Sequence, residues 1–493
     1  MSFLEKFDFS QVKAEVLFKS ELEALIERFK IEDCLLKSGI TKEKGLPPLE
    51  MFRILFLVTL SRQRSILEGL KHEGFLENKT AINDFINNPN INWRKLMYSV
   101  NKIFFKHFKA DVGKDCALII DDTKKEKTGN KVENMAWFRD HCHNTSYRGF
   151  QTIIASLSNE RSSVIIDFEH KIGKKRCKHS KKGQYAVVSH TAKRQADAKK
   201  SKTYLCLSMI RRALKHGFSF SFVLWDSWYN NTASFNYVFK KLVPKGIHLI
   251  SMLKLGNDKY LYNDKEYNLK ELYVKAGNWV EIVGTNIMTK SLEIQIIDKT
   301  TDKRPASGTV KLCFFKYIVK RKKIRNRNKK SKTSKKAVYK ALISTNLELS
   351  EKEIYEQYSR RWGIEVINKD IKTYFGFDQS KSSKYAPMIA DFSLKSIYYT
   401  MICSLKERAP NKSMYQLLLE FVKELEKYNI DTFIKAVLET TLIEFIELAV
   451  SLGYLKLLIT QEQLHEILFD FIHSRNYIDK IEEIDINKKR QSA

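Results

Sequence analysis

Residues 116–123 read Cys-Ala-Leu-Ile-Ile-Asp-Asp-Thr, an apolar run that ends in two acids. A short run without polar residues is typical of a strand buried on both faces of a sheet. A second run, Phe220–Trp225, leads in the same way into Asp226. We therefore expect an α/β fold in which buried strands carry aspartates to one edge of a central sheet.

The segments around these runs predict the remainder of the core. Gln151–Leu157, Ser163–Phe168 and Ile247–Leu253 read as further strands. Apolar residues recur at helical spacing in Ser201–His216 and in about Thr232–Lys241. The predicted order is β-β-β-α-β-α-β, with aspartates after the first and the fourth strands.

The chain divides into regions of different character. Residues 1–110 read as helical and, from their position, are the candidate DNA-binding region. Residues 111–255 form the first part of the predicted core, and 256–345 read as a β-rich, basic insertion of short strands and turns. Residues 346–390 return to the core with a helix that carries Glu365, and 391–493 read as a helical C-terminal region.

A polar face is predicted on the helix that begins near Glu351. If this helix is continuous, Tyr358, Arg361, Glu365 and Lys372 fall within an arc of about 60°. An acid flanked by two cations and a phenol suits a metal ion held beside a phosphate. A solvated helix face with pairs such as Glu365 and Lys369 is the alternative.

The acids of the two strands and of this helix would converge at one edge of the sheet. Three carboxylates can hold two divalent cations, of which one activates the attacking oxygen and the other stabilises the leaving one. Mg²⁺ suits such a site because it prefers oxygen ligands and keeps part of its shell for water and phosphate.

The charge of the chain indicates a polyanionic partner. The 493 residues include 87 Lys+Arg and 57 Asp+Glu, for a formal net charge of +30. Lys171–Lys200 and Lys320–Lys336 concentrate this excess. Clusters of this kind suit the neutralisation of phosphates, which makes binding depend on salt. Solvated basic loops are the alternative.

Composition excludes several classes of protein. With 43% hydrophobic residues, 18 Gly and 7 Pro, the chain is neither collagen-like nor a disordered low-complexity sequence. We find no apolar stretch of the roughly 20 residues that a membrane span needs and no secretory signal at the start. The seven cysteines form no C-x-x-C pair, which is typical of reduced thiols. We expect a cytoplasmic protein.

The sequence resembles the DDE transposases of bacterial insertion sequences, which have a ribonuclease-H-like core. The signature Tyr-x2-Arg-x3-Glu-x6-Lys of one group is met at Tyr358, Arg361, Glu365 and Lys372. The resemblance implies that Asp122, Asp226 and Glu365 bind two Mg²⁺ ions, for which Mn²⁺ can substitute. It favours Asp122, the residue before Thr123, over Asp121. Tyr358, Arg361 and Lys372 would contact the DNA end near the scissile phosphate.

The resemblance also implies an activity and its partners. Such enzymes cut double-stranded DNA at the terminal inverted repeats of the element and join the freed end to target DNA. They work as multimers, so a homodimer on DNA in the bacterial cytoplasm, associated with the nucleoid, is expected. A metal-dependent endonuclease that does not join strands and an inactive DNA-binding protein are the alternatives.

Two further acidic positions need an interpretation. Asp121 adjoins the predicted ligand Asp122 and, if the strand alternation persists, points to the opposite face as a structural acid. Asp167-Phe168-Glu169-His170 stands at the end of the third predicted strand. We interpret this segment as a loop at the end of the strand; a second functional site is the alternative.

Overall fold

The computed structural model describes residues 21–61, 63, 65–107, 116–140, 143–159, 162–299, 306–322, 333–407 and 409–425. The chain forms two compact units, one of Phe29–Asn411 and one that joins Met1–Arg28 to Lys412–Ala493. In the smaller unit, helix α2 spans Glu21–Arg28 and residues 414–425 are helical. The helices predicted after residue 425 lie outside the described residues.

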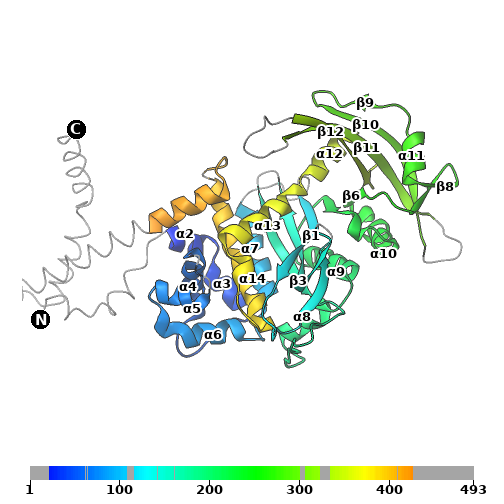
Figure 1. The fold of residues 1–493 in the computed structure, drawn as a ribbon. Helices are drawn as coiled ribbons and strands as arrows, with labels where there is room; N and C mark the ends of the chain where they lie inside the picture. Colours follow the sequence, from blue (N-terminus) through cyan, green and yellow to red (C-terminus); the bar gives the residue numbers. More distant parts are fainter. Residues whose placement is uncertain are drawn as a thin grey trace, which may run out of the picture. The chain divides into compact units, whose positions relative to one another are not determined.

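Helices occupy the larger unit up to the first strand (Figure 1). Their bounds are α3 Ile31–Lys37, α4 Pro48–Leu60, α5 Ile66–His72, α6 Lys79–Asn87 and α7 Trp93–His107. Pro48 is the first helical residue of α4, where a missing N–H removes no helical hydrogen bond. Phe52 and Phe56 of α4 place their rings 5.1 and 4.3 Å from the ring of Tyr398. The predicted DNA-binding role of this region stays a prediction.

The core sheet is mixed. Strand β1 (Ala117–Glu126) lies between β3 (Thr145–Ser158), to which it is antiparallel, and β5 (Phe222–Trp225), to which it is parallel. Next to β5 lies β6 (His248–Leu253), again parallel. Two further strands pair antiparallel with β3, and helices connect β4 to β5 and β5 to β6. These elements are β2 Ala136–Asp140, β4 Ser163–Lys171, α8 His190–Ala198, α9 Lys202–Lys215 and α10 Thr232–Tyr237.

Strand β1 is longer than the sequence predicts. It continues to Glu126, so Asp121 and Asp122 lie within the strand and not at its tip. The parallel pairing with β5 ends at Ile120 opposite Trp225, whereas the pairing with β3 continues to Glu126 opposite Gly149. The two acids therefore begin where β1 loses one of its neighbours. Strand β2 and helix α8 were not predicted, because β2 has only 5 residues and α8 is short and rich in polar residues.

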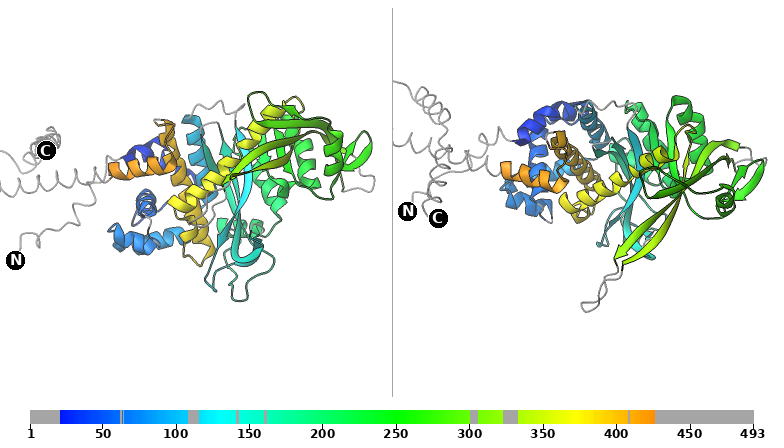
Figure 2. Two further views of the ribbon diagram at one scale, coloured as in Figure 1. Left: turned by 45° about the horizontal axis from the view of Figure 1, so that its top comes forward. Right: turned by 90° about the horizontal axis from the view of Figure 1, so that it is seen from above.

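The insertion continues the core sheet. Strand β12 (Thr333–Ser344) pairs antiparallel with β6, from Ala341 opposite Leu253 to Ser344 opposite Ile250. Together the core and insertion strands form a 12-stranded sheet, seen from two sides in Figure 2. The other elements are β7 Lys259–Tyr262, β8 Lys265–Asn268, α11 Leu269–Lys275, β9 Val280–Glu281, β10 Ile287–Ile297 and β11 Ala306–Lys322. The β7–β8 hairpin and α11 were not predicted.

The two basic runs lie in different settings. Strands β11 and β12 pair as far as Lys322 opposite Thr333, so both ends of Lys320–Lys336 belong to this pair, while residues 323–332 lie outside the described residues. The other run, Lys171–Lys200, leads from the end of β4 into α8. One member of it, Arg194, is buried and paired with Glu169, so it does not contribute to an exposed basic surface.

The helix predicted to continue from Glu351 is broken. Helix α12 ends at Ser359 and α13 (Trp362–Tyr374) begins after Arg361. At the break, the N–H of Arg361 bonds to the carbonyl of Tyr358 and that of Gly363 to the carbonyl of Arg360, three residues back in each case. The backbone is wound more tightly at this point than in an α-helix. Tyr358 therefore lies on one helix, while Glu365 and Lys372 lie on the other.

Helix α14 (Tyr385–Cys403) is almost entirely buried. It contacts β4 and α7 (Figure 1). Pro387 is its third residue, within the first turn, where backbone N–H groups have no helical partner. In the part of the chain that the structure describes, we find no helix with the length and apolar character that crossing a membrane requires.

Candidate active site

Arg361 joins two acids that come from different elements. Its Nη1 donates to Oδ2 of Asp121 at 2.8 Å, and its Nη2 donates to Oε1 of Glu365 at 2.6 Å. Asp121 lies on β1 and Glu365 in the first turn of α13. The side chains of Arg361 and Asp121 are largely buried, at 19% and 16% exposure. Charged hydrogen bonds in such a setting are stronger than at an open surface.

Asp226 stands at the end of the neighbouring parallel strand. It follows Trp225, the last residue of β5, and its backbone is still extended, with φ −90° and ψ 176°. Its Oδ1 accepts a hydrogen bond from the N–H of Trp228 at 2.8 Å, which caps the short turn Ser227–Tyr229. The side chain is therefore fixed by its own loop.

Asp122 has a separate set of partners. Lys202, the first residue of α9, forms an ion pair with Oδ1. Gln151 of β3 donates to Oδ2 at 2.5 Å, and the hydroxyl of Tyr229 lies 3.5 Å from Oδ1. Both carboxylate oxygens of Asp122 are thus engaged.

The acids influence one another electrostatically. Burial raises the pKa of Asp121 to about 7; Arg361 opposes this rise, and the charges of Asp122 and Asp226 add to it. Burial also raises the pKa of Asp226, and the nearby charge of Asp122 contributes. A like charge raises a carboxyl pKa only when it is close. Asp121, Asp122 and Asp226 therefore form one electrostatic cluster.

Tyr358 borders this cluster, and Lys372 lies beside β1. The guanidinium of Arg361 lies 5.9 Å from the ring centre of Tyr358. Burial raises the pKa of Tyr358 to about 12, and the charges of Asp226 and Asp121 add to the rise. Lys372 places its Nζ 3.5 Å from the carbonyl oxygen of Lys124, farther along β1. The predicted DNA contacts of these side chains stay predictions.

The donor types fit a divalent cation, but their present arrangement does not. Carboxylate oxygens are the ligands that Mg²⁺ prefers. Within the described ranges, however, no group of three or more Asp, Glu, His or Cys side chains is arranged to hold a metal ion. The positive charges beside the acids come from Arg361 and Lys202. A metal ion would have to replace these ion pairs.

The acids after the third predicted strand are structural. Asp167 and Glu169 lie within β4, not in a strand-end loop. Asp167 accepts from Tyr98 at 2.6 Å and forms ion pairs with Arg94 and Arg212 at 3.0 and 2.7 Å. Glu169 pairs with Arg94 and Arg194. This buried network ties α7, α8 and α9 to the sheet.

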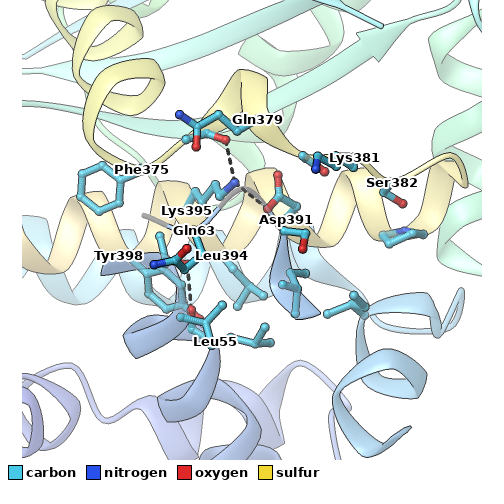
Figure 3. Close-up of a pocket in the computed structure, with 18 of the residues that line it drawn as sticks. Leu55, Gln63, Phe375, Gln379, Lys381, Ser382, Asp391, Leu394, Lys395 and Tyr398 are labelled. Carbon is cyan, nitrogen blue, oxygen red and sulfur yellow. Dashed lines mark hydrogen bonds and ion pairs between the residues drawn. The ribbon is translucent and has the colours of Figure 1, made fainter. Parts of the chain in front are cut away.

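A hollow of about 430 Å³ lies near the end of α13 (Figure 3). Leu55 and Leu394 line it together with polar residues of the segment Gln379–Lys384. Lys395, inside it, pairs with Asp391 at 2.7 Å and donates to the carbonyl of Gly376 at 2.9 Å. Asp391 is the acid among its lining residues, so the hollow does not offer the set of carboxylates found at the strand ends.

Sequence reasoning missed three members of the site. Lys202, Gln151 and Tyr229 all contact Asp122. Lys202 is 80 residues away from Asp122 in the chain, and no local pattern signals such a contact. The one available signal was Ser201, whose side chain caps the N-terminus of α9 and so places Lys202 at the helix start.

Comparison with known proteins identifies one similar family. Residues 55–257 match the model of a family described as DDE superfamily endonuclease. The match spans Asp121, Asp122 and Asp226 and ends before α13, which carries Glu365. A search of curated proteins finds no match. Less than half of the chain is therefore similar to endonucleases that act on DNA and use divalent metal ions.

Proposed function

We propose that this protein is a metal-dependent DNA endonuclease of the DDE type that works as a transposase. It cuts DNA at the ends of an insertion sequence and joins the freed ends to target DNA. The observation that carries the proposal is the position of the acids. Asp226 follows the last residue of β5, and the Asp121–Asp122 pair lies on the neighbouring parallel strand β1, just past the point where its pairing with β5 ends. Arg361 links Asp121 to Glu365. The family match over residues 55–257 supports the same activity.

The architecture supports a ribonuclease-H-like core. A mixed sheet has parallel strands β1, β5 and β6 at its centre, antiparallel β3 beside them and helices packed around them. The insertion of residues 256–345 separates the strand-end acids from the helix of Glu365 in sequence, and β12 returns the chain to the core. This arrangement brings three distant segments to one edge of the sheet.

The side chains at this edge suit phosphodiester chemistry. A bound divalent cation supplies a Lewis acid that polarises the phosphate and lowers the pKa of the attacking water. The carboxylates of the strand-end acids and of Glu365 would hold it. Arg361 has the planar, two-pronged donor geometry that matches a phosphate. On binding DNA, it would exchange its carboxylate partners for the phosphate and free both acids.

The partners in this proposal are double-stranded DNA, both as element ends and as target, and a second copy of the chain bound to the same DNA. The protein would act at the nucleoid of a bacterial cytoplasm. The net charge of +30 and the two basic runs support binding to a polyanion.

The test is an assay of cleavage and joining with DNA that carries the element's own ends, taken from the flanking genomic sequence, in Mg²⁺ or Mn²⁺. Asp226→Asn and Glu365→Gln should bind the ends and lose both reactions. Asp264→Asn, in the exposed β7–β8 turn, is the matched control and should keep them. Cleavage without joined products would reduce the function to that of an endonuclease. Tight binding without cleavage would leave a DNA-binding protein.

A further inference from the structure

A polar groove begins beside the acids of β1. It has a volume of about 730 Å³ and lies between two parts of the chain, the end of β1 with the segment 127–132 and the segment 379–383 before α14. Lys124, which lines the groove, is two residues beyond Asp122 on β1. The two residues share a face of the strand, and their Cα atoms are about 7 Å apart. A DNA strand with one phosphate at the acids would therefore place its next phosphates near Lys124.

Hydrogen bonds between the two segments hold the walls of this groove together. Nζ of Lys127 donates to the carbonyl oxygen of Ser380 at 2.5 Å and to that of Ser382 at 3.0 Å. The N–H of Glu133 donates to the carbonyl oxygen of Ser383 at 2.8 Å. The width of the groove is therefore set by the fold, and a ligand does not have to order its walls on binding.

Arg148 of β3 supports the wall that follows β1. Its Nη1 donates to Oδ1 of Asn130 at 2.9 Å, and its Nη2 donates to the carbonyl oxygen of Thr128 at 3.2 Å. Thr128 and Asn130 line the groove and are exposed. Their hydroxyl and amide groups can therefore donate to phosphate oxygens, as such side chains commonly do in complexes with DNA.

The lining of the groove is positively charged. Among the described residues that line it, Glu126 is the one acid, and the basic side chains are Lys124, Lys127, Lys131 and Lys381. Lys124 forms ion pairs with Glu126 at 2.8 Å and with Asp140 at 3.1 Å. Lys131 and Lys381 are exposed, lie on opposite walls and have no ion-pair partner among the described residues. Their ammonium groups are the ones that can neutralise phosphates.

We propose that this groove binds the sugar-phosphate backbone of the double-stranded DNA end beside the scissile phosphate. Lys131 and Lys381 contact phosphates, and Lys127 is a positioning residue that sets the distance between the walls. This inference rests on the proposed function. It adds a DNA contact that lies outside both basic runs, Lys171–Lys200 and Lys320–Lys336.

The first test measures the binding of the full chain to a duplex that carries the element's end, in EDTA so that no strand is cut. Lys131→Gln together with Lys381→Gln should lower the magnitude of the slope of log K against log salt by about 1.8. Lys240→Gln with Lys241→Gln is the matched control, because it removes the same charge at exposed positions outside the groove. Equal slopes for the two double variants would overturn the proposal.

The second test locates the contact on the DNA. Single phosphates of the same duplex are replaced by neutral methylphosphonates. Replacement of the phosphates nearest the scissile one should weaken wild-type binding about fivefold or more at low salt. The same replacements should weaken binding by the Lys131→Gln, Lys381→Gln variant much less, because both changes remove one interaction. Fully additive effects, or an effect only at phosphates remote from the scissile one, would overturn the assignment.

The role of Lys127 is tested separately. Lys127→Met removes the bonds across the groove and should weaken DNA binding while the salt slope stays nearly unchanged. Lys127→Arg keeps donors at this position and should restore much of the affinity. A fall in slope in Lys127→Met would make Lys127 a phosphate contact and overturn its positioning role. Failure of the proposed function looks different, because the slopes and the methylphosphonate effects would be as expected while no DNA is cut in Mg²⁺ or Mn²⁺.

Discussion

Asp121 and Asp226 hold equivalent positions on the neighbouring parallel strands β1 and β5. The last residues of these strands that lie opposite each other are Ile120 and Trp225, and each acid is the residue that follows. Neighbouring strands lie about 4.8 Å apart, so the sheet itself sets the spacing of these acids. Two like charges at such a spacing repel each other unless a cation lies between or beside them. In the structure, the cation that contacts Asp121 is the guanidinium of Arg361.

Replacement of Arg361 should therefore make the protein depend on a metal ion for stability. Arg361→Met leaves Asp121 and Glu365 without the cation that joins them, and removal of one partner of a mostly buried pair costs about 3 kcal/mol. Urea unfolding without metal should show this loss in the free energy of unfolding. Addition of Mn²⁺ should raise the free energy of unfolding of Arg361→Met more than that of the wild type. Lys369→Met, at an exposed position of α13, is the control. An equal response of wild type and Arg361→Met to Mn²⁺ would contradict this prediction.

The Asp167 network should make stability depend on pH in a defined range. Burial alone would raise the pKa of Asp167, but Arg212, Arg94 and Arg194 outweigh it and hold this pKa below its usual range. A depressed carboxyl pKa contributes stability above the unfolded value of about 3.9, and this contribution is lost as the pH falls below it. Asp167→Asn should therefore cost about 3 to 5 kcal/mol at pH 7. The difference from wild type should shrink below about pH 4.

Urea unfolding of both proteins between pH 7 and pH 3 measures this difference. Asp264→Asn serves as the control for loss of one acidic charge, since Asp264 is exposed. A difference between wild type and Asp167→Asn that stayed constant down to pH 3 would show that Asp167 acts through packing and not through its charge.

The sequence predicted the core strands better than the contacts between them. Apolar runs such as Leu118–Ile120 and Phe222–Trp225 signal buried strands directly, because both faces of each strand are covered. The sequence could not show that β1 continues past its acids, because residues 121–126 are polar and are held in the strand by pairing with β3 alone. Likewise, the sequence analysis predicted a continuous helix across Arg361, although Gly363, a poor helix former, lies close to the break. Gly363 packs so closely on the sheet that an added Cβ would lie 2.5 Å from Oγ of Ser163.

The candidate site shows the same difference between features that local sequence predicts and features that depend on contacts between elements. The signature spacing identified Arg361 and Glu365, which contact each other four residues apart on the chain. The choice between Asp121 and Asp122 depends on the face to which each points. That face is set by strand register, which no local pattern encodes. Lys202 could not be found for a similar reason, since its contact with Asp122 is made in three dimensions only.

DNA binding should depend on salt through the run Lys320–Lys336. Lys329→Gln together with Lys330→Gln removes two positive charges from this run. If both contact phosphates, the slope of log K against log salt should fall in magnitude by about 1.8. Binding to all sequences should weaken alike. Lys240→Gln with Lys241→Gln changes the net charge equally at exposed positions outside both runs and should leave the slope nearly unchanged. Equal slopes for the two double variants would assign the effect to net charge.

Gly149 should be the least replaceable glycine near the candidate site. It lies on β3 between Glu126 of β1 and Ala136 of β2, with φ +150°. An added Cβ would be 2.0 Å from the backbone oxygen of Lys125, which cannot move without shifting β1. Gly149→Ala should lower the free energy of unfolding by about 3 kcal/mol and impair DNA cleavage. Gly217→Ala, at φ +75° with no atom within 4 Å, should cost only about 1 kcal/mol. Urea unfolding of both variants measures these losses of stability. Equal losses would mean that the backbone conformation, and not the contact with Lys125, determines the loss of stability in Gly149→Ala.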